Sequence, residues 1–188
     1  MFLHYLGEGP RKYGLKPVAT HTRQRWAFQC IVRGGCTFEV RDPEAGLRSL
    51  RLPAPWLAVT APGCAHGWKG TARDQCEVRV FQFDEADPLL ANVLGQGGWR
   101  CLSLTPGELR SVQQLHGRCA GAKERMDRFA PLEFRITATE LALLAVRKLP
   151  PAELGPPPDM SRAKVAEALA WYGAHLGSAP RIADVAAA

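Results

Sequence analysis

Two polar side chains that alternate with apolar ones in the segment Arg25–Arg33 have the chemistry to hold a small ligand. The segment is rich in aromatic and β-branched residues, which predicts a β-strand in which every second residue faces the same way. Gln29 and Arg33 therefore share one face with Ala27 and Ile31. An amide and a guanidinium among apolar side chains can orient a polar or anionic molecule in an apolar cavity. We therefore expect Gln29 and Arg33 to contact a ligand.

The opposite face of the same strand is apolar throughout, and it is expected to pack against helices; it carries Trp26, Phe28, Cys30 and Val32. Gly34-Gly35 follows the strand and predicts a two-residue hairpin turn into the next strand. The turn offers a second interpretation of Arg33, as an ordinary surface arginine beside a hairpin.

Four further candidates for ligand-binding residues come from two later segments. His66 and Trp68 lie two positions apart, so they share a face if the segment is extended. His66 is alternatively explained by a hydrogen bond within a turn, and Trp68 by a place in the core. Val78 and Val80 share one face of the segment 75–83 and are expected to shape the pocket.

These candidates require a framework of short strands. The sequence predicts strands over 25–33, 36–41, 47–52, 56–60 and 75–83. Glycine and proline turns separate them at intervals of about 8 to 12 residues, a spacing typical of a β-barrel or jelly roll. The expected fold is therefore mainly β with α, a barrel followed by helices.

Two helices are predicted after the strands. Thr105, Pro106 and Glu108 match the N-cap, first and third positions of a capping box, which starts a helix that runs to about Cys119. A second helix is predicted near 132–149, with an apolar side made of Ile136, Leu141, Leu144 and Leu149. We expect the helices of 106–149 to form the surface of a homodimer, with Leu144 in the interface.

The end of the sequence predicts a linker and two helical segments. Pro150–Asp159 holds five prolines, which predicts a stiff, extended linker. Ser161–Gly177 is predicted to be a helix, and a short polar break at 178–180 precedes a second helical start at 181–188. This order is typical of the entrance to a helix-turn-helix domain, whose base-reading helix the sequence does not contain. The predicted divisions are a barrel over 1–105, a dimerisation region over 106–149, a linker over 150–160 and an incomplete DNA-binding domain over 161–188.

Three parts of the sequence resemble motifs of the AraC-type family of bacterial transcription regulators. Phe28–Phe38 is similar to the family's strand and glycine-rich hairpin. Ala61–Trp68 is similar to its Pro-Gly turn with a following histidine and aromatic residue. Val165–Leu176 and Ile182–Ala186 are similar to the helix that leads into its first helix-turn-helix unit.

The resemblance implies a cupin-like barrel that binds a small-molecule effector, a homodimer, and DNA binding that only the full-length parent would show. It favours Arg33, because members that bind small molecules use an arginine beside this turn. It also favours Trp68, which matches an aromatic position that contacts the ligand in sugar-sensing members. It implies no cofactor, and we expect this chain to have no specific DNA affinity of its own.

The sequence predicts a cytoplasmic protein, and the resemblance implies a bacterial one. The net charge is +6 in 188 residues, and Lys and Arg are not concentrated in one stretch, so charge alone does not support nucleic-acid binding. We find neither a signal peptide nor an apolar run of membrane-spanning length, so we expect no membrane partner. The six cysteines include no Cys-x-x-Cys pair and are expected to be free, buried thiols.

Two alternatives to a sensor remain open. A stand-alone cupin enzyme that uses a metal needs three or four convergent ligands, whereas His66-Gly67-Trp68 supplies one histidine where a His-x-His pair is required. No local signature of a nucleophile is present either, so the sequence predicts that the protein is not an enzyme. The other alternative is a barrel used only for dimerisation, with its pocket filled by Trp56 or Trp68.

Overall fold

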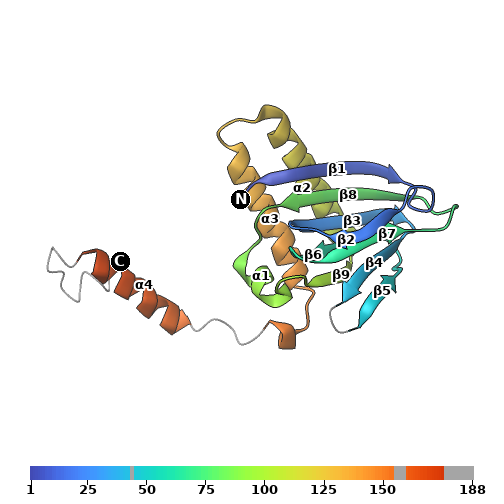
Figure 1. The fold of residues 1–188 in the computed structure, drawn as a ribbon. Helices are drawn as coiled ribbons and strands as arrows, with labels where there is room; N and C mark the ends of the chain where they lie inside the picture. Colours follow the sequence, from blue (N-terminus) through green and yellow to red (C-terminus); the bar gives the residue numbers. More distant parts are fainter. Residues whose placement is uncertain (43–44, 155–159, 176–188) are drawn as a thin grey trace. The chain divides into compact units, whose positions relative to one another are not determined.

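The computed structural model describes residues 1–42, 45–154 and 160–175, and the chain divides into two units, Met1–Leu149 and Pro150–Ala188. The first unit consists of nine strands and three α-helices within its described residues (Figure 1). Its strands are β1 (Leu3–Arg11), β2 (Val18–Thr22), β3 (Trp26–Gly34), β4 (Thr37–Asp42), β5 (Gly46–Leu50), β6 (Trp56–Thr60), β7 (Ala65–Lys69), β8 (Cys76–Phe83) and β9 (Trp99–Ser103). Its helices are α1 (Pro88–Leu94), α2 (Pro106–Arg125) and α3 (Ala130–Val146).

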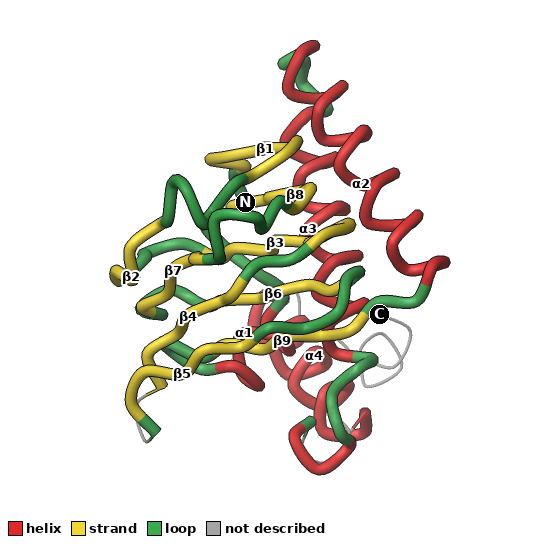
Figure 2. Tube along the Cα trace, turned by 90° about the vertical axis from the view of Figure 1, so that its right-hand side faces the viewer, coloured by secondary structure: helices red, strands yellow, loops and turns green. Residues whose placement is uncertain are grey.

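Two antiparallel sheets face each other and form the barrel. The five-stranded sheet has the order β1-β8-β3-β6-β9, and the four-stranded sheet has the order β2-β7-β4-β5. Figure 2 shows the two sheets side by side, with α2 and α3 beyond the five-stranded sheet. The predicted fold, mainly β with a two-sheet barrel followed by helices, is confirmed.

The predicted hairpin at Gly34-Gly35 is wrong. Strand β3 pairs with β8 on one side and with β6 on the other, so it has no free edge that β4 could join. Gly34-Gly35 instead carries the chain from one sheet to the other. Gly34 has a φ of +82°, and a Cβ there would lie 2.0 Å from the carbonyl oxygen of Gln75, so both backbone conformation and close packing require glycine.

The outer face of β3 packs towards the helices, as its apolar pattern predicted. Phe28 is fully buried and pairs across the strands with Phe81 of β8. The ring of Phe81 contacts His116 of α2 edge to face, with 5.3 Å between ring centroids. The face of β3 that points away from the helices is therefore free to line the interior of the barrel.

The five predicted strands lie within two residues of observed ones, but the strands β1, β2, β7 and β9 and the helix α1 were not predicted. In β1 the residues Gly7, Gly9 and Pro10 interrupt the alternation that identifies a strand. The strand forms at the edge of its sheet, where an interrupted pattern is tolerated because one side needs no partner.

Helix α2 begins at the predicted capping box. Thr105 Oγ1 accepts a hydrogen bond from the Glu108 backbone N–H at 3.3 Å, and the Thr105 N–H donates to Glu108 Oε2 at 2.7 Å. The helix continues six residues beyond the predicted end, to Arg125, and Met126 closes it in the left-handed conformation with a φ of 44°. Helix α3 spans Ala130–Val146 where 132–149 was predicted.

The second unit contains a short 3-10 helix, η1 (Pro151–Glu153), and helix α4 (Met160–Ala174). Helix α4 corresponds to the helix predicted over 161–177. The predicted second helical start at 181–188, the break at 178–180 and residues 155–159 of the predicted linker lie outside the described residues. No helix in the described part of the chain is both long enough and apolar enough to cross a membrane.

We predict that Thr105→Ala lowers the free energy of unfolding by about 1 kcal/mol, because it removes the side-chain acceptor of the capping box. Chemical denaturation followed by circular dichroism measures this change. Ser111→Ala is the matched control, since the Ser111 hydroxyl only donates to the Gly107 carbonyl within the same exposed helix surface. Equal losses in the two variants would contradict the role of the cap.

Candidate ligand-binding cavity

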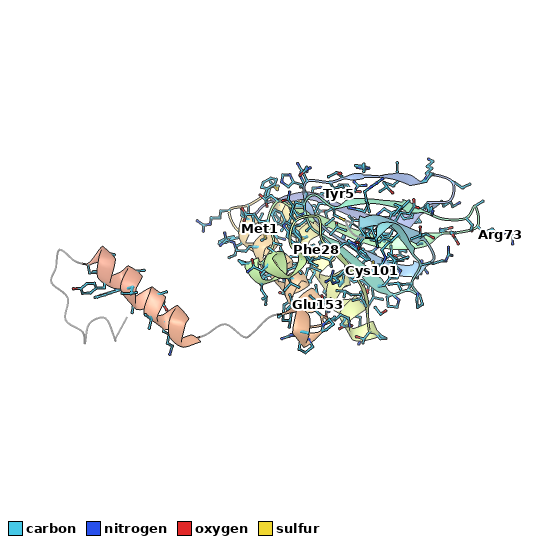
Figure 3. All side chains as sticks on the ribbon, turned by 60° about the horizontal axis from the view of Figure 1, so that its bottom comes forward. Met1, Tyr5, Phe28, Arg73, Cys101 and Glu153 are labelled. Carbon is cyan, nitrogen blue, oxygen red and sulfur yellow. The ribbon has the colours of Figure 1, made fainter. Side chains whose placement is uncertain are left out.

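A cavity of about 920 Å³ lies between the two sheets. This volume is in the range of small-molecule sites, roughly 300 to 1,000 Å³. Its lining includes residues of β1 and β2 and of the loop between them, and the labelled Tyr5 marks the β1 wall (Figure 3). Gln75 also lines the cavity. It ends the β7–β8 loop, whose residue Arg73 is labelled in Figure 3.

The five-stranded sheet lines the cavity with two rows of cross-strand neighbours. The outer row is Gln82, Ala27 and Thr60, and the inner row is Val80, Gln29 and Ala58. Each row contains an alanine, and the small side chains of Ala27 and Ala58 leave the space that larger residues would fill. The predictions that Gln29 and Val80 line the pocket agree with where the structure places them.

The next row along the same strands closes the cavity. Val78, Ile31 and Trp56 are fully buried and pack with Phe38 in the core of the barrel. Val78 therefore lies in the packed core and does not line the cavity, although it shares a face with Val80. Trp56 fills the barrel at the level of this row, but the cavity beside the two neighbouring rows stays open.

Arg33 also lies outside the cavity. The pairing of β3 with β8 shifts between Ile31 and Arg33, so two residues of β3 lie opposite one of β8. Such a bulge reverses the alternation of side chains, and Arg33 turns to the outer face of the sheet. Its side chain is 81% exposed, and its Nε donates to Glu77 Oε2 at 2.7 Å. The expectation that strict alternation carries Arg33 into the pocket is therefore corrected.

Aromatic side chains form the opposite wall. Trp68 of β7 lies 4.9 Å from Phe38 of β4 and stacks on Tyr13 at 5.7 Å with an interplanar angle of 24° (centroid distances). Gln29 Nε2 donates to the Tyr13 hydroxyl oxygen at 2.9 Å, which links the two walls across the interior. The structure thus brings Gln29 and Trp68 together, and Tyr13 is a member of the site that sequence reasoning missed.

His66 lines the cavity as a neutral imidazole. It is 4% exposed, and its Nδ1 lies 3.4 Å from the Cys64 carbonyl oxygen, which agrees with the hydrogen bond in the turn that its position suggested. Burial, with a contribution from the nearby Arg23 charge, lowers the pKa of His66 to about 4. Burial likewise raises the pKa of the Tyr13 phenol to about 12.

Arg23 lines the cavity with a half-buried guanidinium, the kind of group that sequence reasoning placed there at Arg33. Its Nε is buried without a hydrogen-bond partner among the described residues, and so is the hydroxyl oxygen of Thr60. Backbone hydrogen bonds fix the position of Arg23, from its N–H to the Cys64 carbonyl at 3.2 Å and from the Gly63 N–H to its carbonyl at 2.7 Å. These bonds join segments some forty residues apart, so no local signal identifies Arg23.

Among the described residues, no group of three or more His, Cys, Asp or Glu side chains is placed to hold a metal ion. All six cysteines are free thiols in the structure, and Cys101 is the one that is only partly buried. The polar groups that line the cavity are instead amides, hydroxyls, cations and the neutral imidazole of His66.

Comparison with known proteins finds structural neighbours only. No protein-family profile matches the chain, and no curated protein matches its sequence. The chain is similar in structure to the capsular polysaccharide assembling protein CapF from Staphylococcus aureus, with 12% identity, a TM-score of 0.36 and coverage of 53% of this chain and 28% of that one. It is also similar to a point mutant of oxalate decarboxylase from Bacillus subtilis, with 13% identity, a TM-score of 0.34 and coverage of 58% and 28%. The chain thus spans about a quarter of each of these proteins.

We predict that His66 makes the protein less stable in mild acid. The pKa of His66 is lower in the folded chain, about 4, than the ordinary value of 6.5, so the unfolded chain binds more protons between these values. The contribution of His66 is intact above pH 6.5 and falls by about 3 kcal/mol as the pH approaches 4. Urea denaturation at several pH values should give a flatter profile for His66→Gln. The exposed His4→Gln control should keep the wild-type slope, and identical slopes for all three proteins would contradict the assignment.

Proposed function

We propose that Met1–Leu149 binds a small-molecule effector and dimerises, as the regulatory region of an AraC-type transcription regulator. The observation that carries the proposal is the open cavity, whose lining includes Arg23 and Thr60. One polar atom of each residue, Arg23 Nε and Thr60 Oγ1, is buried without a hydrogen-bond partner among the described residues. Buried polar groups in proteins are normally hydrogen-bonded, because leaving them unpaired costs about 1 to 3 kcal/mol each. A bound ligand would satisfy both. A barrel used only for dimerisation has no need of such a space.

The cavity is better suited to binding a signal than to transforming a substrate. A general acid or base works best with a pKa near the operating pH. The pKa values of His66 and Tyr13, about 4 and about 12, keep both side chains neutral at pH 7. Neutral groups of this kind orient a ligand by hydrogen bonds. In this proposal the protein is therefore not an enzyme.

Helix α3 supports a homodimer. Phe129, Ile136 and Leu143 are 39–55% exposed and recur every seven residues, which places them on one face of the helix. Suppose that the α3 helices of two copies pack antiparallel, with the two Ile136 side chains in contact at the centre. Each Phe129 then lies against the partner's Leu143. This self-complementary pattern favours a second copy as the occupant. Leu144, the residue expected in the interface, is half-buried and lies beside this stripe.

In the proposal, the second unit belongs to the DNA-binding part of a longer regulator. Helix α4 occupies the place of the helix that resembles the start of the family's helix-turn-helix domain. An effector can change DNA binding only if it binds one arrangement of the regulator more tightly than another. A regulator of this kind works in the cytoplasm, where free thiols such as the six found here remain reduced.

The binding proposal predicts that a member of a panel of sugars, organic acids and aromatic acids raises the melting temperature in a saturable manner. A ligand that binds only the folded state adds about 2.7 kcal/mol of stability at a hundredfold excess over its Kd. Ala27→Leu should abolish the shift, because it places a larger side chain in the outer row of the cavity. Leu47→Ala, an exposed change on β5, is the control and should keep it. The absence of any shift across the panel would contradict effector binding.

The dimer proposal predicts that Ile136→Glu converts a dimer into a monomer of 20.6 kDa in sedimentation equilibrium at micromolar concentration. Two buried carboxylates would face each other across the interface, which is strongly unfavourable. Gln113→Glu adds the same charge to the exposed surface of α2 and should leave the dimer intact. A dimeric Ile136→Glu variant would place the interface elsewhere.

A further inference from the structure

The charged side chains that line the cavity are all cationic. Within the described part of the chain they are Arg11, Lys12, Lys16 and Arg23, with no aspartate or glutamate among the lining residues. Lys12 and Lys16 are exposed on the β1–β2 loop, whereas Arg23 is half-buried. The cavity therefore carries a positive potential from its loop to its interior, which draws anions towards it.

Among the four cations that line the cavity, Arg23 has the strongest physical reason to bind an anion. It forms none of the salt bridges of the described residues, and its Nε is buried without a hydrogen-bond partner. Other cations near the barrel, such as Arg33 and Arg51, pair with carboxylates at 2.7 Å. A buried cation is costly unless an anion and hydrogen bonds compensate it. Arginine binds carboxylates through parallel N–H donors, which makes a planar carboxylate the best match.

Thr60 adds a second group suited to the same anion. Its Oγ1 is buried without a partner, and a hydroxyl that has no acceptor can donate to a carboxylate oxygen. The charged and polar groups that face Arg23 in the site are neutral or cationic. His66 is a neutral imidazole, and Tyr13 remains a protonated phenol. None of them competes with an incoming anion.

The rest of the cavity suits a flat apolar body. Trp68 and Phe38 form an aromatic wall, Tyr13 stacks on Trp68, and Ala27 and Ala58 leave space opposite them. Aromatic rings favour stacked or edge-to-face contact with other rings. The Tyr13 hydroxyl accepts from Gln29, which leaves its own proton free to bond a polar substituent on a ligand.

We propose that the effector is an aromatic carboxylic acid, bound as its anion with the carboxylate on Arg23 and Thr60 and the ring against Trp68. This inference rests on the proposed function, because it names the chemical class of the ligand in the same cavity. Lys12 and Lys16 attract the anion to the cavity, and Arg23 holds it. Sugars, which the ligand panel also includes, lack a negative charge to pair with Arg23.

Isothermal titration calorimetry of the full chain tests the class of ligand without any mutation. The probes are benzoate and 3-phenylpropionate, each compared with its neutral amide, and glucose and xylose as ring compounds without charge. We expect at least one acid to bind, and its amide to bind about tenfold more weakly or not at all, a difference of about 1.4 kcal/mol. Equal binding of acid and amide would overturn the carboxylate anchor.

Two variants then locate the anchor. Arg23→Gln should weaken binding of the acid by about tenfold or more, whereas Arg33→Gln, the same change on the outer surface, should leave the affinity unchanged. Arg23→Lys keeps the charge without the planar donors and should give an intermediate affinity. Unchanged affinity in a folded Arg23→Gln variant would overturn the role of Arg23.

The outcomes separate this inference from the proposed function. If sugars bind and acids do not, the protein has an effector site but the aromatic acid is wrong. If neither class binds, both the ligand class and the effector site are contradicted. If Ala27→Leu blocks the acid and Arg23→Gln does not, the cavity is the site and the carboxylate lies elsewhere in it.

Discussion

The pairing of β3 between β6 and β8 is the constraint on which the rest of the barrel depends. Because both edges of β3 are occupied, its inward residues and their cross-strand neighbours form fixed rows. The row of Val78, Ile31 and Trp56 fills one part of the interior, and the rows that contain Ala27 and Ala58 leave another part open. A protein interior is normally close-packed, and the small residues in these adjacent rows account for the space that stays open here. The same register places the bulge that turns Arg33 outwards.

Local sequence patterns predicted the elements of the fold better than their connections. Alternation identified β4 and β8, aromatic and β-branched content identified β3, and the capping residues identified the start of α2. Each of these signals depends on neighbours within a few positions. The pair Gly34-Gly35 predicts a reversal of the chain whether the next strand joins the same sheet or crosses to the other one. The choice depends on β6 and β8, which occupy the edges of β3 and come later in the sequence. Turn residues alone do not contain that information.

The candidate site was predictable only where strict alternation holds. Gln29, Val80, His66 and Trp68 line the cavity as expected. Gln29 and Val80 lie in the regular pairing of β3 with β8, and His66 and Trp68 in that of β4 with β7. Arg33 and Val78 were misplaced, because a bulge and a packed row interrupt the inward face of the barrel. Arg23 lies in no strand, and hydrogen bonds to Gly63 and Cys64 bring it to the cavity. The position of Arg23 is therefore determined by contacts between loops that lie far apart in the sequence. One sequence alone does not reveal such contacts.

The central claim is that a small anion binds to Arg23 in the interior of the barrel. NMR can observe the Arg23 side chain directly. The measurement is the ¹H–¹⁵N resonance of the Arg23 Nε–H group, assigned by its loss in Arg23→Lys and followed during titration with benzoate at pH 7. A hydrogen bond to a carboxylate shifts such a proton downfield. The account predicts a saturable shift of this resonance while the Arg33 Nε–H resonance stays in place. An Arg23 resonance that does not move under excess benzoate, or that moves together with that of Arg33, would contradict it.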